Sequence, residues 1–121
     1  MSVDTIEVRV ARGAALLDEK LPGWADRIDL DRLDLGSPCR CILGQTWDEG
    51  RYDDDDPYFM HVRSLFGTYD QQRDAGLGFN INFGAKLLRE MDAEYAELTA
   101  EWRRVIEARR EAAASTPRGE R

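Results

Sequence analysis

The chain of 121 residues is 42% apolar and 34% charged and carries a net charge of −7, which fits one domain with a modest core. No apolar run approaches the roughly 18 residues of a membrane span, and no basic stretch followed by an apolar one marks a signal peptide. The negative charge also disfavours non-specific nucleic-acid binding, which depends on neutralising phosphates. Two cysteines make no disulfide framework, so we expect reduced thiols in a cytoplasm.

The first predicted element begins after Asp4, the expected N-cap, and ends at Pro22-Gly23. Over this window the apolar residues follow helical spacing: Ile6, Val10, Ala14, Leu17 and Leu21. Length therefore favours a helix. Residues 5–10 also alternate between apolar and polar types, as a strand would, and the choice between helix and strand stays open for them.

A short helix and a turn are expected next, because Trp24 and Ile28 stand one helical turn apart and Asp-rich sequence follows. The aspartates do not have the spacing of a calcium-binding loop, so we interpret them as solvated side chains. Ser37 and Pro38 then have the order of an N-cap and a first helical residue, which predicts a helix over residues 38–46.

Both cysteines, Cys39 and Cys41, fall in this predicted helix. Residues i and i+2 of a helix point about 200° apart, so the two thiols would face opposite ways. We expect Cys39 to pack inward with Leu43, and Cys41 to lie nearer the surface. A zinc site takes about four Cys or His ligands, and the chain adds only His61 to the pair. No metal or cofactor is therefore expected, whereas a thiol enzyme that pairs either cysteine with His61 stays an alternative.

The most acidic run precedes a fourth predicted helix, which begins at Pro57 and carries a one-sided apolar stripe that includes Val62 and Leu65. A solvated loop that ends in a helix cap explains this run best. A cation site and a partner surface are the alternatives. The four residues of the run are Asp53, Asp54, Asp55 and Asp56.

Residues 67–84 are rich in glycine and are expected to form a long loop, with a short extended segment near 79–83. The last element is predicted as a long amphipathic helix over residues 85–113, followed by a disordered tail over 114–121. Its apolar seam recurs at alternating spacings of three and four: Leu88, Met91, Tyr95, Leu98, Trp102 and Val105.

Arginines near the C-terminus form a weak basic region, in which Arg103 and Arg110 are seven residues apart and share one face of the helix. Glutamates are interleaved with them, so a solvated face is the favoured interpretation and phosphate binding the alternative. Residues 71–121 hold nine acidic and nine basic side chains, whereas residues 1–70 hold 15 acidic and 8 basic ones.

Two segments, "RGAALLDEKLPGWADRIDLDRLDLGSPCRCILGQ" (12–45) and "YAELTAEWRRVIEARR" (95–110), resemble small uncharacterised proteins of actinobacteria and their bacteriophages. The most specific blocks are residues 24–35 and 37–45. The resemblance covers roughly half of the chain. It implies a phage or prophage product in the host cytoplasm, and it brings no catalytic residues and no mechanism.

Together these patterns predict an all-α fold of four or five helices in a single domain over residues 1–113. The expected core residues are Trp24, Ile28, Leu33, Leu35, Cys39, Leu43, Leu65, Leu98, Trp102 and Ile106. With no assembled catalytic site in view, we expect a non-enzymatic accessory protein that binds a host protein or itself, for example as a homodimer through the C-terminal helix. Its expected interaction residues are the four aspartates 53–56, Arg103 and Arg110.

An acidic mimic of nucleic acid that inhibits a DNA-binding protein is the second hypothesis, suggested by the acidic first half of the chain. The thiol enzyme is the third. Nucleic-acid binding through the C-terminal arginines is less favoured because of the net negative charge.

Overall fold

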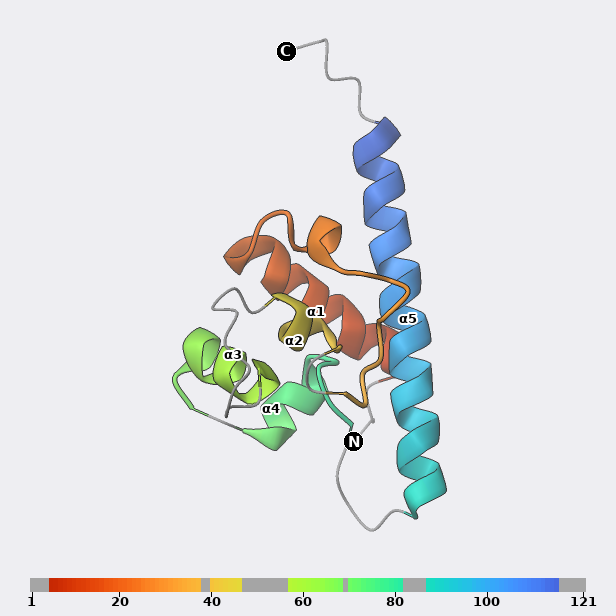
Figure 1. The fold of residues 1–121 in the computed structure, drawn as a ribbon. Helices are drawn as coiled ribbons and strands as arrows, with labels where there is room; N and C mark the ends of the chain where they lie inside the picture. The colour runs from red at the N-terminus through yellow and green to blue at the C-terminus, as the bar shows by residue number, and fades with distance from the viewer. Residues whose placement is uncertain (1–4, 38–39, 47–56, 69, 82–86, 116–121) are drawn as a thin grey trace.

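The computed structural model describes residues 5–37, 40–46, 57–68, 70–81 and 87–115, and these residues contain five α-helices, one 3₁₀ turn and no strand. The elements are α1 (Ile6–Lys20), η1 (Trp24–Arg27), α2 (Ile42–Thr46), α3 (Pro57–Phe66), α4 (Gln71–Gly76) and α5 (Leu88–Ser115). The predicted all-α fold with a long C-terminal helix is therefore confirmed. Figure 1 shows α5 along one edge of the molecule and longer than the body beside it, with α1 crossing it.

The helix α1 settles the ambiguity of the first segment, because residues 6–10 are helical and the strand alternative is wrong. The N-cap is Thr5 rather than Asp4: its side-chain oxygen accepts a hydrogen bond from the Val8 N–H at 3.2 Å. The buried face of α1 includes Gly13, where a Cβ atom would lie 2.0 Å from the Leu77 carbonyl oxygen. The absence of a side chain thus lets two backbone segments approach each other closely.

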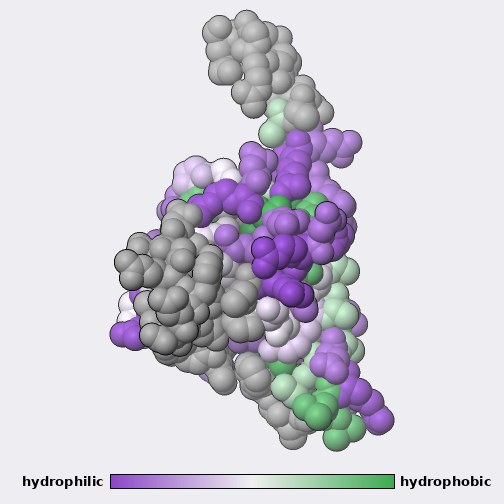
Figure 2. Space-filling model, in the orientation of Figure 1, coloured by the Kyte–Doolittle hydropathy of each residue, from purple (hydrophilic) through white to green (hydrophobic). Residues whose placement is uncertain are grey.

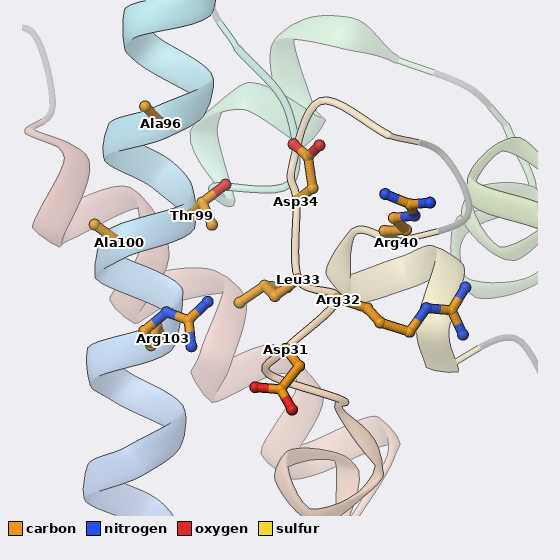
Figure 3. Close-up of a pocket in the computed structure, with 9 residues that line it drawn as sticks. All are labelled: Asp31, Arg32, Leu33, Asp34, Arg40, Ala96, Thr99, Ala100 and Arg103. Atoms are coloured by element: carbon orange, nitrogen blue, oxygen red, sulfur yellow. The ribbon is translucent and has the colours of Figure 1, made fainter.

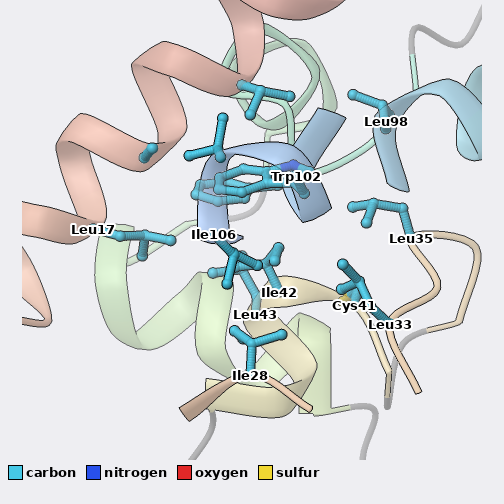
Figure 4. Close-up of a cluster of buried hydrophobic side chains, with 14 of the residues drawn as sticks. Leu17, Ile28, Leu33, Leu35, Cys41, Ile42, Leu43, Leu98, Trp102 and Ile106 are labelled. Atoms are coloured by element: carbon cyan, nitrogen blue, oxygen red, sulfur yellow. The ribbon is translucent and has the colours of Figure 1, made fainter. Parts of the chain in front are cut away.

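Trp102 of α5 is the centre of the core (Figure 4). The ring of Trp24 meets it edge-on at 5.6 Å between centroids, and Phe79 stacks on it at 5.7 Å. Its indole N–H donates to the Gly78 carbonyl at 2.7 Å, so the one polar atom of the side chain is satisfied inside the core.

The predicted seam of α5 is right in its middle and wrong at its start. Leu98, Trp102 and Val105 are buried, whereas Leu88 is 78% exposed. Met91 and Tyr95 are half-buried. The helix itself begins three residues later and ends two residues later than the predicted range of 85–113.

Two further corrections concern short helices. The helix predicted over 38–46 begins only at Ile42, and it is preceded by a turn in which the Arg40 and Cys41 N–H groups both bond the Ser37 carbonyl. Cys41 is consequently buried at 2% exposure, where we expected a position nearer the surface. Within the predicted loop 67–84, α4 forms a turn and a half, and the Asp70 carboxylate caps it by accepting from the Gln72 and Arg73 N–H groups.

Most of the predicted core is confirmed: Trp24, Ile28, Leu33, Leu35, Leu43, Leu98, Trp102 and Ile106 are all buried. Leu65 is half-buried and packs against that cluster. Cys39 lies outside the described residues, as does part of the extended segment expected near 79–83, of which residues 79–81 form no strand.

Candidate functional site

A surface pocket of about 620 Å³ lies where the connection after η1 meets α5 (Figure 3). Its walls come from three parts of the chain: the loop 31–34, the turn before α2, and one side of α5. Small side chains on α5 leave the room for it. The lining residues are Asp31, Arg32, Leu33, Asp34, Arg40, Ala96, Thr99, Ala100 and Arg103.

The loop that carries the pocket is fixed to α5 by its own backbone. The Leu35 N–H donates to the Thr99 hydroxyl oxygen at 3.0 Å, and that hydroxyl donates to the Tyr95 carbonyl at 2.8 Å. Arg103 donates to the Leu30 carbonyl at 2.8 Å. Since Leu33 is also buried, the loop is held at both ends and through its middle, and the pocket is a preformed feature.

The turn before α2 is tied to the same loop. The Asp34 N–H donates to the Arg40 carbonyl at 3.2 Å, and the Gln45 side-chain amide donates to that same carbonyl at 2.9 Å. The Gln45 amide oxygen in turn accepts from the Asp29 N–H at 2.6 Å. These bonds fix the backbone of Arg40 beside the loop. The position from which the Arg40 side chain extends along the pocket is therefore fixed as well.

The pocket is lined by side chains of both charges, and three of these charged groups make no hydrogen bond or ion pair within the described part of the chain. Arg32 and Arg40 are exposed, and within the described part of the chain their guanidinium groups make no hydrogen bond or ion pair. The Asp31 carboxylate is likewise unengaged there, whereas the Asp34 carboxylate accepts from the Gly36 N–H at 2.9 Å. Guanidinium groups donate hydrogen bonds and do not lose a proton near neutral pH, so the two arginines can bind an anion.

The expected solvated face of α5 is wrong for Arg103 and Arg110. Both are half-buried, and both donate to backbone carbonyls of the loop segment that crosses α5. Arg110 bonds the Ala25 carbonyl at 2.8 and 3.0 Å and also the Ile28 carbonyl. Each of these two expected interaction residues therefore holds the chain together, and Arg103 in addition lines the pocket.

Arg109 pairs with Asp18 of α1 at 2.6 Å, and the indole N–H of Trp24 donates to the same carboxylate at 2.8 Å. The hydrogen bond from Arg109 lowers the pKa of Asp18, with a smaller contribution from Trp24, and partial burial opposes them. The same pair raises the pKa of Arg109. The pair ties the end of α1 to α5 and lies apart from the pocket lining.

His61 and Cys41 take part in the packing of α2 and α3. His61 is buried, and its Nδ1 lies 2.9 Å from the Leu43 carbonyl oxygen and 3.1 Å from the Thr46 hydroxyl. A carbonyl only accepts, so Nδ1 carries the ring proton. The Cys41 Sγ accepts from the Gly44 N–H at 3.3 Å. These bonds give each side chain a structural role, and the thiol enzyme stays a prediction without support from them.

The sequence interpretation missed a buried ion pair. Arg9 of α1 and Glu94 of α5 lie 2.8 Å apart, both almost fully buried. Arg9 also donates to the Ala75 carbonyl at 2.7 Å and the Asn80 carbonyl at 2.8 Å. The position of Arg9 in the helix could have indicated its burial, because Arg9 stands four residues before Gly13 on the same buried face.

Large apolar side chains are exposed at the start of α5. Leu87 is 55% and Leu88 78% exposed, and Figure 2 shows hydrophobic surface gathered at this end of the helix. Asp53, Asp54, Asp55 and Asp56 lie outside the described residues, so the acidic surface and the nucleic-acid mimic stay predictions.

Comparisons with protein-family models, curated proteins and solved structures find no match to this chain. Within the described residues, no group of three or more His, Cys, Asp or Glu side chains is placed to hold a metal ion. None of the helices in that part of the chain combines the length and the apolar character that a membrane crossing requires.

Proposed function

We propose that this protein is a non-enzymatic binding module, an accessory protein that engages another protein of the cell in which it acts. The observation that carries the proposal is the uncovered end of the apolar seam on α5. Leu88 stands one helical turn before Met91 and two before Tyr95, so it continues the stripe that is buried further along. Its 78% exposure leaves this continuation open to an apolar partner face.

The proposal also covers the origin of the protein and the cell compartment in which it acts. The resemblance of residues 12–45 and 95–110 to actinobacterial and phage proteins favours a phage or prophage product that acts on a host protein in the host cytoplasm. Its support is that resemblance alone.

Self-association through α5 is the second form of the proposal. The middle of the seam, at Leu98 and Trp102, is covered by the body of the same chain. A homodimer would therefore use the end of α5 around Leu87 and Leu88. Light scattering coupled to size-exclusion chromatography distinguishes this form from binding to a different protein.

The test compares the wild type with Leu88→Ser in affinity capture from host lysate, with mass spectrometry of the retained proteins. Because Leu88 is so exposed, the substitution should change the free energy of unfolding by less than about 0.5 kcal/mol. Val8→Ser removes another exposed apolar side chain, on α1, and serves as the matched control. We expect a partner, or the dimer, to be lost with Leu88→Ser and kept with Val8→Ser; equal retention by both variants would contradict the proposal.

A further inference from the structure

The pocket beside α5 is a locally basic place on an acidic chain. Three arginines and two aspartates line it, whereas the chain as a whole has a net charge of −7. Arg32 and Arg40 are exposed and are paired with nothing in the described part of the chain. Two unpaired guanidinium groups on residues that line the same pocket attract carboxylates, and they can form bidentate hydrogen bonds with them.

The arrangement of the pocket favours a ligand that extends across it. Figure 3 shows Arg103 on the α5 side and Arg32 and Arg40 on the opposite side, with Leu33 between them. Asp31 and Asp34 lie on opposite sides of Leu33 in the same view. The pocket opens broadly to solvent, whereas sites for small molecules commonly bury about 70–90% of the ligand surface. A chain segment that runs across the pocket and continues beyond it does not need such enclosure.

We propose that this pocket docks an extended acidic segment of a partner protein. One carboxylate of the segment pairs with Arg32 and Arg40, and a second reaches the N–H groups of Arg103 that the Leu30 carbonyl does not occupy. The unengaged carboxylate of Asp31 accepts from a backbone N–H of the segment. This inference rests on the proposed function, since it names the chemistry of the partner.

The two aspartates argue against nucleic acid as the occupant. They reduce the formal charge of the lining to one net positive charge, and they stand within the same pocket as the arginines. A nucleic acid carries phosphates along its whole backbone and would bring some of them against these carboxylates. A peptide has carboxylates only at chosen positions and offers N–H donors elsewhere, so it complements both signs of charge.

The test measures fluorescence anisotropy of labelled short peptides that carry two Asp or Glu residues at different spacings. Matched peptides with Asn or Gln in their place serve as probes of charge. The protein is the full chain as wild type and as Arg32→Gln/Arg40→Gln. Lys20→Gln/Arg89→Gln removes the same charge at exposed positions outside the pocket and is the control.

We expect the wild type to bind the acidic peptides and not their neutral counterparts, with affinity that falls as salt rises. The double arginine variant should weaken binding by about fivefold or more, and the control by less than about twofold. Equal weakening by both double variants would reduce the effect to net charge and overturn the proposal. The proposal would also be overturned if the wild type bound no acidic peptide, or if it bound inorganic phosphate or duplex DNA instead of the acidic peptides.

The lysate experiment separates this inference from the proposed function. A partner that is retained by Arg32→Gln/Arg40→Gln and lost with Leu88→Ser supports a binding module and overturns the pocket as its docking site. A partner lost with both variants supports both.

Discussion

Replacing Gly13 by alanine tests the closest approach in the core. In an ordinary helix this change stabilises by about 1 kcal/mol, because alanine has the higher helix propensity. Here the new Cβ atom would lie 2.0 Å from the Leu77 carbonyl oxygen, and 3.1 Å from both the Leu77 carbonyl carbon and the Trp102 ring. The oxygen belongs to the backbone, so it cannot turn away as a flexible side chain would.

The steric effect should outweigh the propensity. Forcing a methyl group into a packed core costs about 1–3 kcal/mol, and the overlap here exceeds an ordinary tight contact by roughly an ångström. The segment that must move also carries the Gly78 carbonyl, which accepts from the Trp102 indole at 2.7 Å. We therefore take the cost at the upper end of that range, about 3 kcal/mol, which leaves a net destabilisation of about 2 kcal/mol after the gain in propensity. This is equivalent to a melting temperature lower by roughly 8 °C in a chain of this size.

Denaturant unfolding followed by helical circular dichroism measures this change. Ala15→Gly, at an exposed position of the same helix, calibrates the propensity and should cost about 1 kcal/mol. If Gly13→Ala is as stable as the wild type or more so, α1 does not approach Leu77 in solution as the structure shows, and the reasoning fails.

Three further measurements test the ion pairs and the cap. Arg9→Met should cost about 3–5 kcal/mol in urea unfolding, because it removes the buried guanidinium that pairs with Glu94 and bonds the Ala75 and Asn80 carbonyls, and adding Glu94→Met should recover part of the loss. Asp18→Asn should remove the stabilisation that its ion pair with Arg109 contributes. This pair is partly exposed to solvent, so the loss should be less than about 1 kcal/mol. Because the pKa of Asp18 is lowered from its ordinary value of 3.8, that difference from wild type should be present above pH 3.8 and be lost as pH falls through the lowered pKa of the folded protein. Thr5→Ala should cost about 1 kcal/mol of stability through the lost bond to the Val8 N–H.

The sequence predicted the elements that bury a regular apolar stripe. Leu98, Trp102 and Val105 are spaced as a helix that packs on one side requires, and they are buried as that spacing implies. The helix α4 has no such stripe. Its start is a local capping interaction of Asp70, and its single buried apolar residue, Ala75, leaves no periodic signal among the neighbouring glycines.

The predicted register of the cysteine segment was wrong for a related reason. Ser37 and Pro38 have the residue types of a helix start, but the Ser37 carbonyl closes a turn instead, and the helix begins at Ile42. That difference places Cys41 just before the helix and inside the core. Propensity at one pair of residues could not show it, because bonds from the Asp34 N–H and the Gln45 side-chain amide to the Arg40 carbonyl also fix the turn.

The candidate site was the least predictable part. Arg103 was expected to be solvated because charged residues on a helix usually are, yet its long side chain reaches the Leu30 carbonyl, 73 residues away in sequence. Arg32 and Arg40 carried no pattern at all. They meet at one pocket because the loop after η1 and the turn before α2 are joined through Gln45 and through the bond from the Asp34 N–H to the Arg40 carbonyl.

The position of α5 constrains how any partner binds. Its middle forms one wall of the core, and fully burying side chains such as Leu98, Trp102 and Ile106 contributes about 1.5–3 kcal/mol each. Their sum is comparable to the whole free energy of unfolding of a small domain, about 5–15 kcal/mol. A partner that replaced the body along this seam would therefore have to unfold the chain it binds. Binding without unfolding is confined to surfaces that are already formed, and on this helix those include the exposed end at Leu88 and the side that lines the pocket.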